Sequence, residues 1–152
     1  MAEQSAITAG HKPGTSVQDL QNQWSKRASL LNNGPVLSCS AMADAKTTKK
    51  DWKAPFKGRV TGVRCTVSNT APVATATVAV DNATQSNQIL SAATVALTSG
   101  FTLNTPKDMT LTSTAADLEF NEGDSLEVSW VTSGGSGAIT DSQVQILVEP
   151  RD

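Results

Sequence analysis

The chain has 152 residues, a hydrophobic fraction of 38% and a net charge of −2, which fits one soluble domain with an appendage. No run approaches the roughly 18 consecutive apolar residues of a membrane span, and the small net charge argues against a dedicated nucleic-acid binder. Residues 1–75 hold ten Lys/Arg and four Asp/Glu, whereas residues 76–152 hold two Lys/Arg and ten Asp/Glu. This asymmetry either steers the basic half onto an acidic surface, aligns neighbouring subunits, or is neutralised within one fold.

Residues 1–15 mix small and polar residues without periodicity, and we expect a mobile tail there. Residues 16–32 predict an amphipathic helix, with Ser16 as its N-cap and Gly34-Pro35 ending it. Its apolar stripe recurs at spacings of three and four: Val17, Leu20, Trp24, Ala28 and Leu31. So short a helix is marginal in water, so the stripe must pack on its own domain, a symmetry mate or a partner. We therefore divide the chain into an arm at 1–34 and a domain at 35–152.

From residue 35 onward the apolar period changes to two, which predicts strands with one buried face. About eight strands are expected, because alternating residues centre on Leu37–Ala41, Val63–Val67, Ala76–Val80, Ile89 with Val95–Leu97, Met109–Leu111, Leu118–Phe120, Leu126–Trp130 and Val144–Val148. Loops are expected at Asp81-Asn82, Asn104–Pro106, Asn121–Asp124 and 133–137. No helical pattern separates the strands, so the fold class is all-β, a two-sheet antiparallel sandwich of jelly-roll type. An open sandwich leaves edge strands, which an oligomer can cover.

The chain offers little for catalysis. Its one histidine, His11, lies in the predicted tail, where nothing positions an imidazole for a nucleophile or a metal. We therefore expect no enzyme, no cofactor and no small-molecule substrate. Cys39 and Cys65 each fall in an alternating apolar pattern and predict buried thiols, with one disulfide between neighbouring strands as the alternative.

Five carboxylates cluster around one predicted turn. They are Asp117, Glu119, Glu122, Asp124 and Glu127. Hard cations such as Ca²⁺ take several carboxylate oxygens from a loop, which makes Glu122 and Asp124 candidate ligands. The spacing does not match an EF-hand loop, so a solvated acidic turn without metal is favoured.

A basic run precedes the second predicted strand. It contains Lys46, Lys49, Lys50, Lys53, Lys57 and Arg59, interleaved with Trp52 and Phe56. Cations beside aromatic rings can hold a nucleic-acid backbone and stack bases, but the pattern fits no recognised module. The alternatives are a docking surface for an acidic partner and a solvated loop, with the two aromatic rings closing over the core edge.

The chain resembles small virion proteins of tailed phages, especially capsid decoration (cement) proteins. The resemblance is carried by the segments TATVAV at 75–80, LEFNEGDSLEVSW at 118–130 and VQILV at 144–148, together with the arm and helix at 1–34. It implies a homotrimer on the capsid surface that binds the major capsid protein and stabilises the lattice, with no nucleic acid or membrane as partner. The chain start has no apolar signal region, so we expect folding in the host cytoplasm.

Charge and expected exposure suggest docking residues: Val17, Leu20, Trp24, Leu31, Lys46, Lys49, Lys50, Trp52 and Lys53. The alternative function is a small head-fibre or appendage protein that binds a host-surface ligand. Its recognition would lie in loop tips such as 133–138 rather than in the arm.

Overall fold

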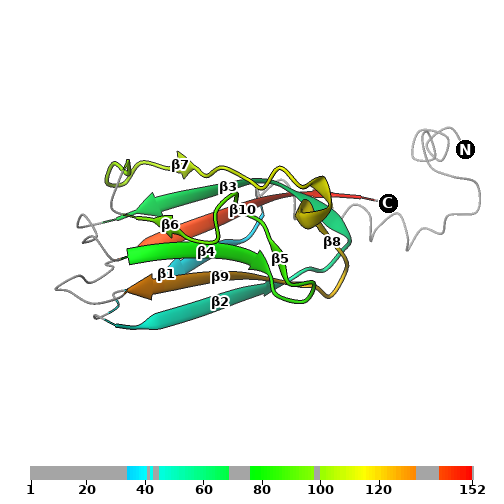
Figure 1. Cartoon of the computed structure of the whole chain (residues 1–152), viewed down its shortest axis with the longest axis horizontal. Helices are drawn as coiled ribbons and strands as arrows, with labels where there is room; N and C mark the ends of the chain where they lie inside the picture. The colour runs from blue at the N-terminus through cyan, green and yellow to red at the C-terminus, as the bar shows by residue number, and fades with distance from the viewer. Residues whose placement is uncertain are drawn as a thin grey trace, which may run out of the picture.

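Two antiparallel β-sheets face each other in the computed structural model, which describes residues 34–40, 42, 45–68, 76–97, 100–132 and 141–151 (Figure 1). The first sheet has the order β1-β10-β3-β7, with β8 also pairing β3. The second has the order β2-β9-β4-β5, with β6 also pairing β4. The elements are β1 Val36–Cys39, β2 Thr47–Lys53, β3 Gly58–Val67, β4 Ala76–Asn82, β5 Asn87–Gln88, β6 Val95–Ala96, β7 Lys107–Asp108, the 3₁₀ helix η1 Ala115–Leu118, β8 Glu119–Phe120, β9 Ser125–Thr132 and β10 Ser142–Pro150.

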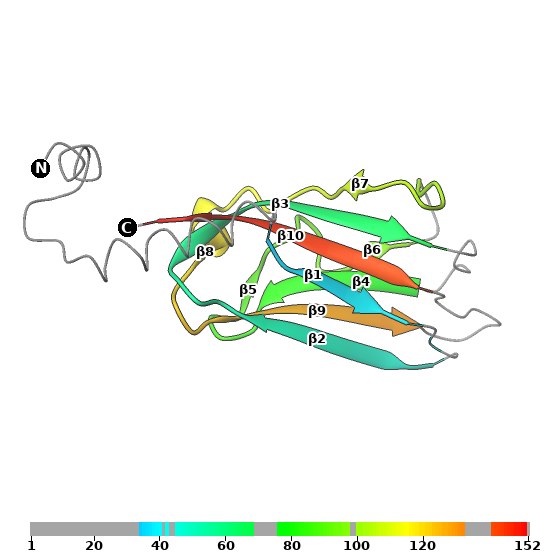
Figure 2. The ribbon, with the colours of Figure 1, turned by 180° about the vertical axis from the view of Figure 1, so that it is seen from behind.

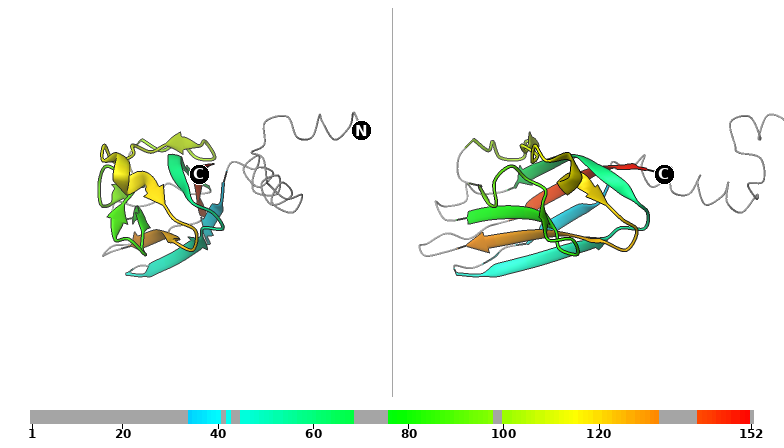
Figure 3. Two further views of the ribbon diagram at one scale, coloured as in Figure 1. Left: turned by 90° about the vertical axis from the view of Figure 1, so that its right-hand side faces the viewer. Right: turned by 45° about the vertical axis from the view of Figure 1, so that its right-hand side comes forward.

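The alternation in the sequence explains the core. In β9, every second side chain from Leu126 to Thr132 is buried, and in β10 the same holds from Ser142 to Ile146. Because successive side chains of a strand point to opposite faces, these residues meet between the sheets. The left view of Figure 3 looks along the strands and shows the sheets facing each other. The largest fully buried side chains are Trp130, Phe120, Ile89, Leu90, Leu97, Leu126 and Ile146.

The two margins of the sandwich differ. At one margin, the short strands β5 to β8 and the isolated bridge between Leu90 and Leu111 connect the sheets. At the other, β1 ends the first sheet and β2 ends the second, and these consecutive strands contact each other (Figure 2). Two edge strands therefore run along the same margin.

The all-β, two-sheet antiparallel prediction is confirmed. The tail at 1–15, the helix at 16–32 and the glycine-rich loop at 133–137 lie outside the described residues. Within the described part, the only helical element is η1, and no helix is long and apolar enough to cross a membrane.

Several predicted boundaries are wrong. Residues 47–53 form β2, because an edge strand can carry charged residues on both faces and needs only Trp52 against the core. The predicted loop at Asp81-Asn82 belongs to β4. The side-chain oxygen of Asn82 accepts hydrogen bonds from the backbone of Thr84 and Gln85, both at 3.2 Å, so the turn begins after it.

Other boundaries shift by one or two residues. The strand predicted at Met109–Leu111 lies earlier in the chain: β7 has two residues and ends at Asp108. Leu111 forms only an isolated bridge with Leu90. Leu118 closes η1 instead of opening a strand. The described part of the chain contains ten strands rather than about eight, since two-residue strands carry no readable alternation.

Candidate docking edge

The predicted basic run forms the outermost strand of the second sheet. β2 pairs with β9 along its whole length, from Thr47 opposite Val131 to Lys53 opposite Ser125. Just before it, the backbone of Lys46 is fixed by Thr132: Lys46 N donates to Thr132 Oγ1 at 3.1 Å, and Thr132 N donates to Lys46 O at 2.9 Å. The main chain that carries the lysines is therefore rigidly placed.

The lysines of β2 divide between its two faces. Lys49 points to the outer face, where its ammonium lies 2.7 Å from Glu127 Oε1. That hydrogen bond, reinforced by the charge of Glu127, raises the pKa of Lys49. Lys46, Lys50 and Lys53 are exposed, and within the described residues neither Lys50 nor Lys53 forms an ion pair. The edge thus carries ammonium groups that no carboxylate of the described chain neutralises.

Trp52 does not project like the lysines. It is half-buried, and its ring meets Phe56 at 6.1 Å between centroids and Phe120 at 6.0 Å, both edge-to-face. Phe56 and Phe120 are also 6.0 Å apart. Such edge-to-face pairs are favourable beyond the area that they bury. Trp52 therefore holds the end of β2 on the core, as the sequence predicted for Trp52 and Phe56.

A lysine-rich edge has two physical consequences. Exposed edge strands expose unpaired backbone groups, and lysine side chains prevent another chain from pairing with them. The same positive strip attracts a surface rich in carboxylates, with a strength that salt reduces.

The predicted calcium ligand Asp124 holds a turn together. It is only 5% exposed, and its Oδ2 accepts hydrogen bonds from Asn121 N at 2.8 Å, from Asn82 Nδ2 at 3.0 Å and from Gln85 Nε2. Burial raises the pKa of Asp124, but the three hydrogen bonds outweigh it and hold the pKa below its usual value.

Glu122, the second calcium candidate, is exposed in the same turn. No group of three or more His, Cys, Asp or Glu side chains among the described residues has a geometry that could hold a metal ion. Because Oδ2 of Asp124 already receives three N–H donors, this oxygen serves the turn, and the arrangement favours the metal-free interpretation.

Both cysteines are buried and free, which confirms the predicted thiols. Burial raises the pKa of Cys65 to about 12. Burial also raises the pKa of Cys39, although the charge of nearby Lys50 opposes the shift. Neither thiol is therefore poised to react as a thiolate.

A row of carboxylates crosses the outer face of the second sheet. Asp51 of β2, Glu127 of β9 and Asp81 of β4 occupy directly opposed positions on the three strands. Burial and the charge of Glu127 raise the pKa of Asp81, and Lys49 partly offsets this. The row was not predicted from the sequence, because its members lie far apart in the chain and only strand register brings them together.

The predicted docking residues Val17, Leu20, Trp24 and Leu31 lie outside the described residues. Comparison with protein-family models, with curated proteins and with solved structures found no match for this chain. The resemblance to decoration proteins therefore stays a prediction.

Proposed function

We propose that this chain is a non-catalytic structural protein, a capsid decoration protein that docks through the β2 edge onto an acidic surface of the major capsid protein. The observation that carries the proposal is a group of exposed lysines along a rigid edge: Lys46 just before β2, and Lys50 and Lys53 within β2 on its two faces. Long-range attraction of this kind guides docking and sets orientation.

The finer fold assignment, a jelly roll, belongs to the same proposal. The first strand pairs with the last, β1 with β10, and the second pairs with the one before the last, β2 with β9. This nested pairing is what two Greek-key units of a jelly roll produce. It supports the likeness to virion proteins, which rests otherwise on the sequence segments.

The place where the described chain begins also supports docking at this margin. The chain enters β1 immediately after Gly34 and Pro35, and β1 contacts β2. Residues 1–33 are joined to the domain at the margin that carries the charged edge. The arm and the edge can therefore engage the same partner surface. Two linked weak contacts then give an attachment far stronger than either alone, and a homotrimer would multiply it further.

The test uses attachment to particles. The full chain is mixed with lysate from the cells that naturally produce it, and its co-sedimentation with capsid-sized particles is measured in a density gradient. We expect Lys50→Ser/Lys53→Ser to abolish co-sedimentation, and high salt to weaken it for the native chain. The control Lys107→Ser/Arg151→Ser removes the same charge elsewhere and should leave attachment intact.

Two results would overturn the proposal. One is unchanged attachment of Lys50→Ser/Lys53→Ser together with new self-association, which would leave the lysines only the role of blocking edge pairing. The other is binding to intact host cells but not to particles, which would favour the appendage protein. Light scattering on the full chain tests the trimer, whose mass should be three times 15.8 kDa.

A further inference from the structure

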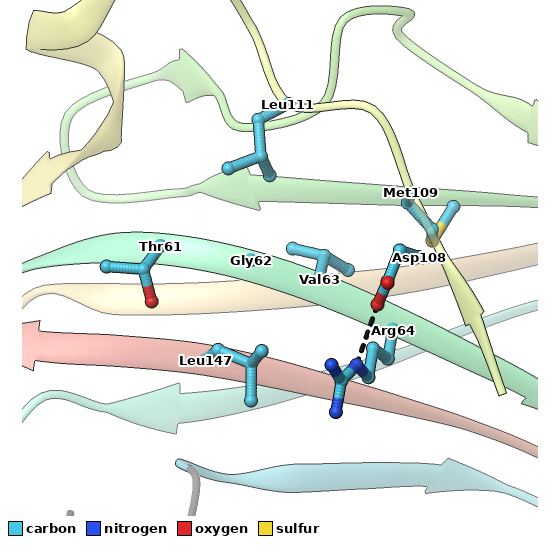
Figure 4. Close-up of a pocket in the computed structure, with 8 residues that line it drawn as sticks. All are labelled: Thr61, Gly62, Val63, Arg64, Asp108, Met109, Leu111 and Leu147. Carbon is cyan, nitrogen blue, oxygen red and sulfur yellow. Dashed lines mark hydrogen bonds and ion pairs between the residues drawn. The ribbon is translucent and has the colours of Figure 1, made fainter.

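A shallow hollow of about 300 Å³ lies on the outer face of the first sheet (Figure 4). Its apolar walls are Leu147 of β10 on one side and Met109 and Leu111, which follow β7, on the other. At one end Arg64 Nε lies 2.7 Å from Asp108 Oδ1. The remaining lining residues belong to β3: Thr61, Gly62 and Val63.

The hollow exists because β3, although paired with β10 along its whole length, lacks a strand partner over its middle on its other side. β7 pairs with β3 only at Arg64 and Cys65, and β8 only at Gly58 and Arg59. The register with β10 shifts between Leu147 and Val148. Leu147, which faces outward, thus lies opposite Gly62, and the gap between β7 and β8 lies on the other side of β3.

Gly62 deepens the hollow. A Cβ at this position would lie 2.9 Å from Leu147 Cδ1, closer than real side chains approach, so the leucine leans over the bare backbone. Leu147 is half-buried and, opposite Gly62 in the strand register, lies on the outer face of the sheet.

The described chain begins beside the same leucine. Gly34 has φ of +79°, and a Cβ there would lie 2.0 Å from Ile146 O and 3.5 Å from Leu147 Cα. Ile146 N also donates to Pro35 O at 3.0 Å. The described chain therefore begins alongside Ile146 and Leu147 of β10. Val36, the next outward-facing residue, is 51% exposed.

We propose that residues 17–31 of this same chain pack on the outer face of the first sheet, with their apolar stripe over Leu147 and the hollow. Leu31 precedes Gly34 by three residues, a reach of about 10 Å, and neighbouring strands are about 4.8 Å apart. A helix over 16–32 would be about 25 Å long, which a ten-residue strand such as β3 can accommodate. Because residues 17–31 are tethered to the domain, their effective concentration at this surface is roughly millimolar. They therefore outcompete the same segment of a second copy at lower chain concentrations.

This surface is a property of the free chain and goes beyond the proposed attachment. Packing of residues 17–31 on the first sheet would persist if the protein docked on something other than a capsid. Attachment through β2 would likewise persist if this packing did not occur. The two ideas therefore fail independently.

The test is limited trypsin digestion of the full native chain. Within the arm the only lysines and arginines are Lys12, Lys26 and Arg27, and trypsin cuts poorly between Lys12 and Pro13. Cleavage after Lys26 or Arg27, followed by mass spectrometry, thus reports whether the segment is covered. We expect slow cleavage in the native chain and a rate at least about tenfold higher in Leu147→Ser, because cleavage tracks the open population.

The matched control is Val131→Ser, which removes a half-buried, outward-facing apolar side chain near the end of β9 in the other sheet. It should leave the cleavage rate unchanged. If Leu147→Ser disturbs folding, Leu20→Ser tests the proposal instead, because Leu20 lies outside the sandwich. Leu20→Ser should raise the rate of cleavage after Lys26 or Arg27 as Leu147→Ser does. Asn22→Ser, on the opposite face of the predicted helix, should not.

Chain concentration separates the occupants. Protection that is constant over a roughly hundredfold range of concentration supports packing within one chain. Protection that disappears on dilution overturns the proposal in favour of a second copy. Equal cleavage of the native chain and Leu147→Ser also overturns it.

Discussion

Removing the Asp124 carboxylate should loosen the turn that joins β8 to β9. Asp124→Ala deletes the acceptor of three hydrogen bonds, from Asn121 N, Asn82 Nδ2 and Gln85 Nε2. Hydrogen bonds to a charged group contribute about 1.5–3 kcal/mol each. Asn82 is 1% exposed and cannot replace its partner with water, whereas the part-exposed Gln85 can. We therefore expect a loss of about 3–5 kcal/mol in the free energy of unfolding.

Asp124→Asn keeps an acceptor oxygen and loses the charge, so the expected loss is smaller, about 1–3 kcal/mol near neutral pH. The pKa of Asp124 is lowered from 3.8 in the folded chain. Its stabilising contribution is therefore present above pH 3.8 and is lost as the pH falls through the lower folded-state pKa. The deficit of Asp124→Asn should shrink in that acidic range.

Urea unfolding, followed by tryptophan fluorescence from neutral to acidic pH, measures both effects. The exposed Glu122→Gln in the same turn is the control and should change stability by less than about 0.5 kcal/mol. A loss below about 1 kcal/mol for Asp124→Ala would contradict this role of the Asp124 carboxylate. So would a deficit of Asp124→Asn that grows as the pH falls.

The remaining predictions concern other buried or coupled groups. Asp81→Asn should stabilise the protein by about 0.5 kcal/mol near neutral pH; because the pKa of Asp81 is raised from 3.8, the gain should vanish below that pH, as urea titrations would show. Ser142→Ala should cost about 1–3 kcal/mol in thermal unfolding, since the buried Trp130 Nε1 loses its acceptor at 2.5 Å. Neither Cys39 nor Cys65 should react with a thiol reagent until denaturant is added, because both are buried. Excess CaCl₂ should leave the unfolding midpoint unchanged; a rise that Glu122→Gln abolishes would restore the calcium hypothesis.

The fold class and most of the core follow from the amino-acid pattern alone. Alternation identified the buried faces of Val63–Val67 in β3, of β4, of Leu126–Trp130 in β9 and of Val144–Ile146 in β10, because these stretches have one face in the core and keep the period of two. It also identified Trp52 and Phe56 as rings over the core edge. Both cysteines were placed correctly for the same reason.

Features that depend on neighbours far along the chain become visible only in the folded structure. β2 carries charge on both faces, so its strand character comes from pairing with β9 and not from its own pattern. Asp124 looked like a solvated or metal-binding turn residue, whereas donors from Asn82 and Gln85, about forty positions away, make it a buried acceptor. The carboxylate row and the hollow beside Leu147 exist only through strand register, a relation between segments that local periodicity does not contain.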